Sequence, residues 1–255
     1  YKNLAFLNSP DARPIRVLCE LVETEQRLAA HGIENTLVFF GSARMRSQED
    51  ADKALAEAEA RHSRGEDGSE AALAVAQRVA RTAKYYEATR ELARRMTAWS
   101  MQKRQHRYVV CSGAGPGIME AANRGASDVD GGKSVGLGIS LPFEAGNNDY
   151  VTPDLSFEFH YFFTRKYWFL YPAKAIVVFP GGFGTMDELF ETLTLIQTGK
   201  VKKSLPIVLF GQEYWNEILN TRAMADFGTI SEADLKLVFA TDSVDAAFEY
   251  LTDRL

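Results

Sequence analysis

The stretch PGGFGTMDE, residues 180–188, combines residue types that bind anions with one that can catalyse a reaction. Glycines allow backbone amides to approach a phosphate closely, and the positive end of a following helix adds to the attraction. A carboxylate such as that of Glu188 can deprotonate water or stabilise a developing positive charge. The groups expected to contact a phosphate in this stretch are Gly182, Gly184 and Thr185.

The same stretch also has a purely structural interpretation. Thr185 and Glu188 have the T-x-x-E spacing of a helix capping box, in which the glutamate bonds back to the N-cap amide. Spacing alone favours this cap. A phosphate bound by Gly182, Gly184 and Thr185 would instead put Glu188 one helical turn further on, facing the attached sugar. The spacing leaves both roles open.

Two cations lie upstream, where Arg165 and Lys166 interrupt the aromatic pattern YFFTRKYWF at 161–169. Adjacent side chains on a helix point about 100° apart, so one of the two can face inward. We expect Lys166 to be the solvated one, because a lysine buries its stem and extends its head into water. A buried Arg165 needs an anionic partner, either a phosphate or Glu188. His160 is expected to pack among its aromatic neighbours and not to be catalytic.

Two further loops follow predicted strands, FGSAR at 40–44 and CSGAGPGIME at 111–120. In open α/β sheets, ligands bind outside the carboxyl ends of the strands. Each loop alone fits a tight turn that needs glycine for a positive φ, but three such loops at one edge favour a phosphate-bearing ligand. The candidate binding residues in these two loops are Gly41, Ser42, Gly113, Gly115 and Glu120. Glu120 is either a second ligand-facing acid or a first-turn residue favoured by the helix dipole.

The sequence does not match the known fingerprints of dinucleotide-binding and triphosphate-binding proteins. The dinucleotide pattern G-x-G-x-x-G would need glycine at positions 118 and 187, which hold Ile118 and Asp187. GGKS at 131–134 resembles the end of a Walker A motif, but Ser127 stands where that motif needs an earlier glycine, and a strand follows the segment. The sequence therefore supports neither a dinucleotide nor a hydrolysable triphosphate.

Alternating strands and helices are predicted to position these loops. The apolar runs that we interpret as strands lie at 36–40, 108–113, 134–141, 175–182, 205–211 and 235–241. Apolar strands that alternate with helices predict an α/β fold, a Rossmann-like doubly wound and mostly parallel sheet with helices on both faces.

The segment 48–105 departs from this alternation. It consists of two Ala-, Glu- and Arg-rich parts with helical periodicity, separated by GEDGS at 65–69, and so predicts a helical hairpin. The hairpin lies between the first and second strands. We therefore interpret it as an insertion in the first crossover of a single nucleotide-binding domain, residues 1–255. One face of its second arm carries Leu73, Ala76, Ala80, Ala83, Tyr86 and Leu92.

Composition narrows the possible partners. The net charge of −5 over 255 residues offers no overall attraction to nucleic acid or to an anionic membrane. Cys19 and Cys111 form no CxxC pair and the four histidines lack metal-ligand spacing, so no disulfide framework or metal site is expected. No apolar run approaches the roughly 20 residues that span a bilayer. No signal-peptide pattern opens the sequence, and a cytoplasmic location is expected.

Taken together, TRK at 164–166 and PGGFGTMDE at 180–188 resemble the PGGxGTxxE signature of the Lonely Guy family. Members are cytokinin riboside 5′-monophosphate phosphoribohydrolases that were long labelled lysine decarboxylases. SGAGPGIMEAANRGA and ELFETLTLIQTGK are similar to the longer bacterial members. The resemblance runs from about Thr36 to the last predicted strand, and the 48–105 hairpin departs from the short plant-type pattern.

The resemblance implies that Arg165 and Glu188 are the catalytic pair, and that Lys166 stands beside them among the substrate- or phosphate-binding residues. It implies a phosphate-binding loop of Gly181, Gly182, Gly184 and Thr185. The family hydrolyses the N-glycosidic bond of a nucleoside 5′-monophosphate without a cofactor, so AMP or an N6-substituted AMP is the expected substrate. Members are at least dimeric with the site near the subunit interface, and a homodimer or higher homo-oligomer is expected.

Other functions stay open on the residues alone. A non-catalytic carrier or sensor of a nucleotide or a molybdenum cofactor on the same fold would use the glycine loops but would not need Glu188. A lysine decarboxylase would need pyridoxal phosphate and a Schiff-base lysine, and Lys166 is the only lysine close to the motifs. The hairpin could also serve primarily to bind another protein.

Overall fold

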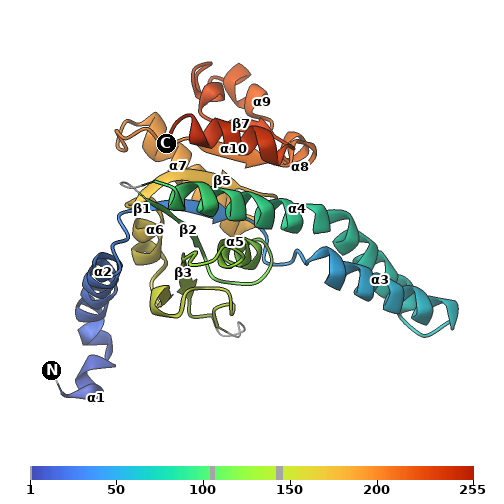
Figure 1. Cartoon of the computed structure of the whole chain (residues 1–255), viewed down its shortest axis with the longest axis horizontal. Helices are drawn as coiled ribbons and strands as arrows, with labels where there is room; N and C mark the ends of the chain where they lie inside the picture. Colours follow the sequence, from blue (N-terminus) through green and yellow to red (C-terminus); the bar gives the residue numbers. More distant parts are fainter. Residues whose placement is uncertain (1, 104–106, 142–145) are drawn as a thin grey trace.

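The protein is built on a seven-stranded sheet, seen in a computed structural model that describes residues 2–103, 107–141 and 146–255 (Figure 1). The strand order is β4-β3-β2-β1-β5-β6-β7, and every neighbouring pair is parallel. The strands are β1 (Asn35–Phe40), β2 (Tyr108–Ser112), β3 (Ser134–Ile139), β4 (Ser156–Phe159), β5 (Ala173–Val178), β6 (Ile207–Phe210) and β7 (Phe239–Thr241). The predicted doubly wound parallel fold is confirmed.

The helices cover both faces of this sheet. They are α1 (Leu4–Leu7), α2 (Arg13–Ala30), α3 (Gln48–Ser63), α4 (Ser69–Met101), α5 (Ile118–Ser127), α6 (Phe162–Leu170), α7 (Phe183–Gln197), α8 (Gln212–Ile218), α9 (Thr221–Asp226) and α10 (Val244–Thr252). Short 3₁₀ turns lie at Pro10–Ala12, Pro153–Leu155 and Asp234–Lys236. In the described ranges no helix is long and apolar enough to cross a bilayer.

Alternate side chains of β1 enter two separate cores, as the period of a strand requires. Val38 and Phe40 pack with residues of α2, α6 and α7 on one face. Leu37 and Phe39 pack with residues of α4, α5 and α10 on the other. Because both faces are covered, the strand reads as a continuous apolar run, which is why the sequence reveals it.

Strand order reverses on either side of β1, and this reversal positions the site. The chain runs outward from β1 through β2, β3 and β4, and then returns to place β5 on the other side of β1. Such a switch point opens a crevice at the carboxyl ends of the two neighbouring strands. The loops after β1, β2 and β5 all lie at this edge.

The predicted hairpin is present between β1 and β2 as α3 and α4. Figure 1 shows α3 and the first part of α4 extending away from the sheet, while the rest of α4 lies across it. Leu92 and Met96 of α4 are fully buried and pack against α5. The second arm is therefore part of the core. A single domain over residues 1–255 stays a prediction.

Candidate active site

A cleft of about 1300 Å³ opens at the carboxyl ends of the central strands. Loop residues after β1, β2 and β5 line it, together with side chains of α4, α6 and α8. The sequence-predicted residues that line the cleft are Gly41, Ser42, Gly113, Arg165, Gly181, Gly182, Gly184, Thr185 and Glu188. Three predicted residues, Gly115, Glu120 and Lys166, are not part of its lining.

Helix α7 begins earlier than a capping box at Thr185 would require. Its N-cap is Gly182, its first residue is Phe183, and the cap makes no side-chain hydrogen bond. Thr185 therefore lies inside the first turn and Glu188 in the second. The T-x-x-E spacing does not form a capping box here, and the structural interpretation of Glu188 as a cap is wrong.

The glycines of the loop before α7 differ in what they do. A Cβ at Gly181 would lie 2.1 Å from Thr185 Oγ1, so close packing demands glycine there. A Cβ at Gly182 or Gly184 would meet no atom within 4 Å, and neither residue has a positive φ. Packing and backbone conformation therefore do not explain these two glycines. Both border the open cleft, where the absence of a side chain leaves the amides accessible.

Glycines of the other two loops are set by the close approach of α5. A Cβ at Gly41 would lie 2.6 Å from Ile118 Cγ2, and one at Gly113 would lie 2.8 Å from Met119 Sδ. A Cβ at Gly115 would lie 2.7 Å from Met119 Cε. Gly115 does not line the cleft and has no positive φ, so close packing against Met119, and not a positive-φ turn, explains this glycine.

A residue that the sequence did not single out, Asn148, holds the loop after β2. Ala114 adopts a left-handed conformation, with a φ of 61° that side-chain-bearing residues rarely adopt. Its amide donates to Ser112 Oγ at 3.0 Å, and Asn148 Nδ2 donates to the carbonyl oxygens of Ala114 and Gly115 at 2.9 and 3.1 Å. These bonds stabilise a strained turn at the edge of the cleft.

Glu188 is a buried acid that borders the cleft. The residue is 4% exposed, and no described group hydrogen-bonds to its Oε2. Burial raises the pKa of the Glu188 carboxyl to about 7, against the opposing charges of Lys166 and Arg165. Near neutral pH the carboxyl therefore exchanges protons readily, as a general base must.

Arg165 projects from α6 into the same cleft, as predicted for the inward-facing cation. Its guanidinium carbon lies 5.4 Å from the ring centroid of Phe162 and 5.3 Å from that of Phe169. Contact with two aromatic faces stabilises the charge and fixes the plane of the guanidinium. Its positive charge also opposes the rise in pKa that burial causes at Glu188.

Lys166 is not solvated, contrary to the prediction. Its Nζ lies 2.8 Å from Asp187 Oδ2 and 2.9 Å from Glu191 Oε2, and its side chain is only 16% exposed. Burial acts to lower the pKa of Lys166, but the bonds to the two carboxylates outweigh it and the pKa is raised. The side chain joins α6 to α7 and so fixes Arg165 relative to Glu188.

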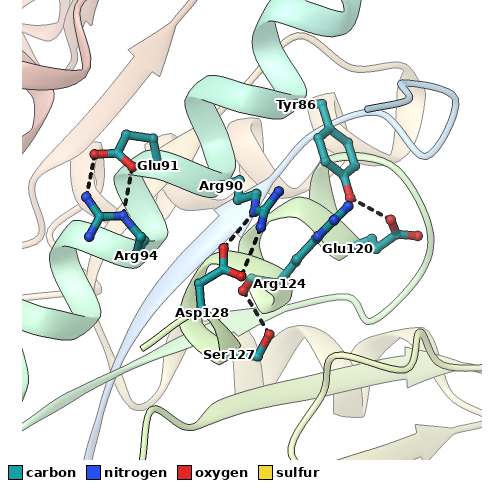
Figure 2. Close-up of polar contacts among 8 residues, drawn as sticks. All are labelled: Tyr86, Arg90, Glu91, Arg94, Glu120, Arg124, Ser127 and Asp128. Carbon is teal, nitrogen blue, oxygen red and sulfur yellow. Dashed lines mark hydrogen bonds and ion pairs between the residues drawn. The ribbon is translucent and has the colours of Figure 1, made fainter. Parts of the chain in front are cut away.

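Glu120 contacts the hairpin instead of the cleft. Tyr86 of α4 donates from Oη to Glu120 Oε1 at 2.6 Å, and burial together with this bond raises the pKa of Tyr86 (Figure 2). Arg90 and Asp128 form a second, two-bonded contact along the same pair of helices, at 2.6 and 3.0 Å. The predicted packing of His160 among its aromatic neighbours is wrong, because this residue is exposed.

Residues of α4 and α8 that the sequence did not single out also line the cleft. These lining residues are Arg78, Arg81, Thr82, Lys84, Tyr85, Glu213, Tyr214, Glu217, Ile218 and Leu219. Tyr214 donates from Oη to the carbonyl oxygen of Gly181 and so stabilises the glycine loop. Among the described residues, no group of three or more His, Cys, Asp or Glu could hold a metal ion.

The sequence model of a family described as "Possible lysine decarboxylase" matches residues 119–251. The chain belongs to this family. The matched residues of this possible lysine decarboxylase family extend from the first turn of α5 into α10 and include Arg165, the glycine loop and Glu188.

Solved structures include the molybdenum cofactor binding protein from the phototrophic bacterium Rippkaea orientalis, to which the chain is similar. The identity is 13% and the TM-score 0.49, over 86% of this chain and 96% of that chain. No curated protein sequence matches the chain.

The family description raises the question of pyridoxal phosphate, which needs a lysine that can lose its proton. Within the described ranges the lysine that lines the cleft is Lys84, and Lys166 lies next to Arg165 outside the lining. Lys84 pairs with Glu213 at 3.3 Å and Lys166 with two carboxylates, and these contacts leave the pKa of both amines raised. Neither of these two lysines fits a pyridoxal phosphate site.

Proposed function

We propose that the protein is a nucleoside 5′-monophosphate phosphoribohydrolase that releases free base and ribose 5-phosphate from AMP or an N6-substituted AMP. The observation that carries the proposal is Glu188, a buried carboxyl that borders a cleft, with an oxygen lacking a described hydrogen-bond partner. Burying such a group costs stability, which is reasonable at a site where the group performs a reaction.

The 5′-phosphate binds at the start of α7 in this proposal. Gly182, Gly184 and Thr185 all line the cleft, and open space lies where a side chain of either glycine would be. The N-terminal end of a 15-residue helix adds a favourable dipole. Glu188 lies one turn further along the same helix, so a sugar attached to this phosphate comes within reach of its carboxylate.

The reaction breaks the bond between C1′ and the base nitrogen. The base departs with the bonding electron pair and takes up a proton, leaving an oxocarbenium-like ribosyl group, by analogy with O-glycoside hydrolysis. The Glu188 carboxylate stabilises this positive charge and accepts a proton from the water whose oxygen bonds to C1′. We assign no side chain as the acid that protonates the base.

Arg165 and Lys166 take different roles. Arg165 lies in the cleft between two aromatic rings and would hold the substrate in register by contacting an anionic group. Lys166 acts as a positioning residue, because its two ion pairs hold α6 against α7. Its place beside the catalytic pair is thus explained without contact to the substrate.

The test is chromatographic detection of adenine after incubation with AMP, for the wild-type protein and for Glu188→Gln. Release by the wild type alone supports the proposal. Equal release by both proteins contradicts the role of Glu188. Binding of AMP without release of base would favour a non-catalytic nucleotide carrier on the same fold.

We also propose that the protein acts as a homodimer or higher homo-oligomer. Helices α2 and α6 pack together and expose the large apolar side chains of Ile15, Leu18, Val22, Phe163, Tyr167 and Tyr171. An exposed apolar surface of this kind is typical of an interface. Light scattering should give a mass above 28.4 kDa, and Leu18→Asp should lower it. A monomeric mass for the wild type contradicts the proposal.

A further inference from the structure

Three further arginines, all of them exposed, line the cleft and play no part in the reaction described above. Arg78 and Arg81 come from α4, and Arg44 comes from the loop after β1. We propose that they form a second anion subsite, which binds an additional phosphate on a nucleotide whose 5′-phosphate is held by the glycine loop. This inference rests on the proposed function.

The geometry of α4 places this subsite relative to the glycine loop. A Cβ at Gly211 would lie 2.9 Å from both Pro180 Cγ and Tyr85 Cε1, so the Tyr85 ring lies beside the start of the loop. Arg81 and Arg78 precede Tyr85 by four and seven residues and share its helical face. At 1.5 Å per residue, they lie roughly 6 and 10 Å further along the helix axis.

The charges around these arginines favour an external anion. Other arginines of the hairpin pair with carboxylates, as Arg90 does with Asp128 and Arg94 with Glu91. Within the described ranges, none of the three cleft arginines forms an ion pair. A guanidinium matches the geometry of a phosphate, with which it forms two parallel hydrogen bonds.

Carboxylates do not neutralise the subsite. The acids that line the same cleft are Glu188, Glu213 and Glu217, and Glu213 already pairs with Lys84 at 3.3 Å. The cleft therefore keeps an excess of positive charge in a chain whose net charge is −5. An anion drawn to this chain is held by such local groups.

The volume of the cleft, and the part of the chain that supplies its arginines, agree with a larger substrate. Its volume of about 1300 Å³ exceeds the roughly 300–1,000 Å³ that is usual for small-molecule pockets. All three arginines precede residue 119, where the family match begins. The second subsite thus belongs to a part of the chain outside the matched region, where substrate preference can differ from that of other members.

The experiment measures binding calorimetrically in the Glu188→Gln protein, which should not turn over its ligand. The probes are AMP, ADP and adenosine 3′,5′-bisphosphate. We expect at least one doubly phosphorylated probe to bind about tenfold more tightly than AMP, the gain from a charge-assisted contact. Adding Arg78→Gln and Arg81→Gln should reduce the affinity ratio to near one.

Lys53→Gln with Lys236→Gln is the matched control, because it removes the same charge from exposed positions outside the cleft and should keep the ratio. A preference for ADP would place the second phosphate on the 5′ chain, and a preference for the bisphosphate would place it on the ribose. Binding of AMP with no gain for either probe, or a gain that survives the arginine substitutions, overturns the inference alone. Failure of all three probes to bind contradicts the proposed function and the inference together.

Discussion

Asp187 and Glu188 are consecutive residues of α7 whose carboxylates lie in opposite environments. The Asp187 side chain is 55% exposed and its Oδ2 lies 2.8 Å from Lys166 Nζ, whereas Glu188 is 4% exposed and borders the cleft. The turn of about 100° per residue separates the two groups. One acid therefore contributes to structure, and its neighbour is available for chemistry.

This contrast supplies a matched pair of substitutions. Glu188→Gln should lower the rate of base release by roughly 10²–10⁴-fold, because an amide can neither accept a proton nor balance the ribosyl cation. Asp187→Asn removes the same charge one residue away and should retain most activity. Steady-state release of adenine measures both, and similar losses in the two variants would contradict the assignment.

Stability should depend on pH through Glu188. Burial raises its folded-state pKa to about 7 from the ordinary 4.5, so between these values the folded state binds more protons than the unfolded state. The free energy of unfolding therefore falls as pH rises through this window, and the penalty is complete above pH 7. Relative to wild type, Glu188→Gln should be more stable at pH 8 than at pH 5 by roughly 2 kcal/mol.

Urea unfolding of both proteins at the two pH values measures this difference. Asp187→Asn serves as the control, since its carboxylate is largely exposed. A helix cap makes a different prediction, a loss of about 1 kcal/mol on substitution. A stability difference that does not change between pH 5 and pH 8 would contradict the buried, ionisable state of Glu188.

Arg165 should prove necessary for turnover but not for folding. Arg165→Ala should reduce kcat/KM by about 10²-fold, the usual effect of removing one stabilising donor from an active site. Arg165→Lys keeps the charge but loses the planar contact with Phe162 and Phe169, and should recover only part of the activity. Full activity in Arg165→Ala would make Arg165 a structural residue.

The glycines before α7 should separate stability from activity. Gly184 lies in the first turn of α7, and an added Cβ there would contact no other atom. Gly184→Ala should therefore raise the free energy of unfolding by up to about 1 kcal/mol while kcat/KM falls. Gly182→Ala should lower kcat/KM without loss of stability. Gly181→Ala should instead lower stability by about 1–3 kcal/mol, because its Cβ would lie 2.1 Å from Thr185 Oγ1.

Thermal unfolding and steady-state kinetics on the three alanine variants check this pattern. Unchanged kcat/KM in both Gly182→Ala and Gly184→Ala would show that the phosphate does not bind at these amides.

The fold could be predicted from the sequence where burial is uniform. The all-apolar run of β1 and the Ala-rich periodicity of the hairpin each had one reasonable interpretation, and both are confirmed. Strand β4 could not be recognised, because Phe157 and Phe159 alternate with exposed Glu158 only briefly before the aromatic residues of α6 begin. When the alternating apolar pattern of a strand runs directly into the apolar pattern of a helix, the sequence does not show where the strand ends.

The site was predictable only where residue type and spacing along the chain identify a chemical role. The glycine loop, Arg165 and Glu188 could be chosen from residue type and spacing, and the structure brings them to one cleft. The ion pairs of Lys166 depend on how α6 packs against α7, and the positions of Arg78 and Arg81 at the cleft depend on the direction of α4. The spacing of residues that are close in sequence predicts neither the packing of α6 against α7 nor the direction of α4.

The central position of β1 also has a consequence for how the protein folds. Thr36 of β1 pairs with Ala173 of β5 across about 140 intervening residues, a contact whose loop-closure entropy delays its formation. The cleft lies where β1 and β5 meet. It therefore forms only after these two strands, which are far apart in the sequence, have paired. During synthesis, an emerging chain cannot bind its ligand until β5 has left the ribosome, and ligand binding would report one of the last steps of folding.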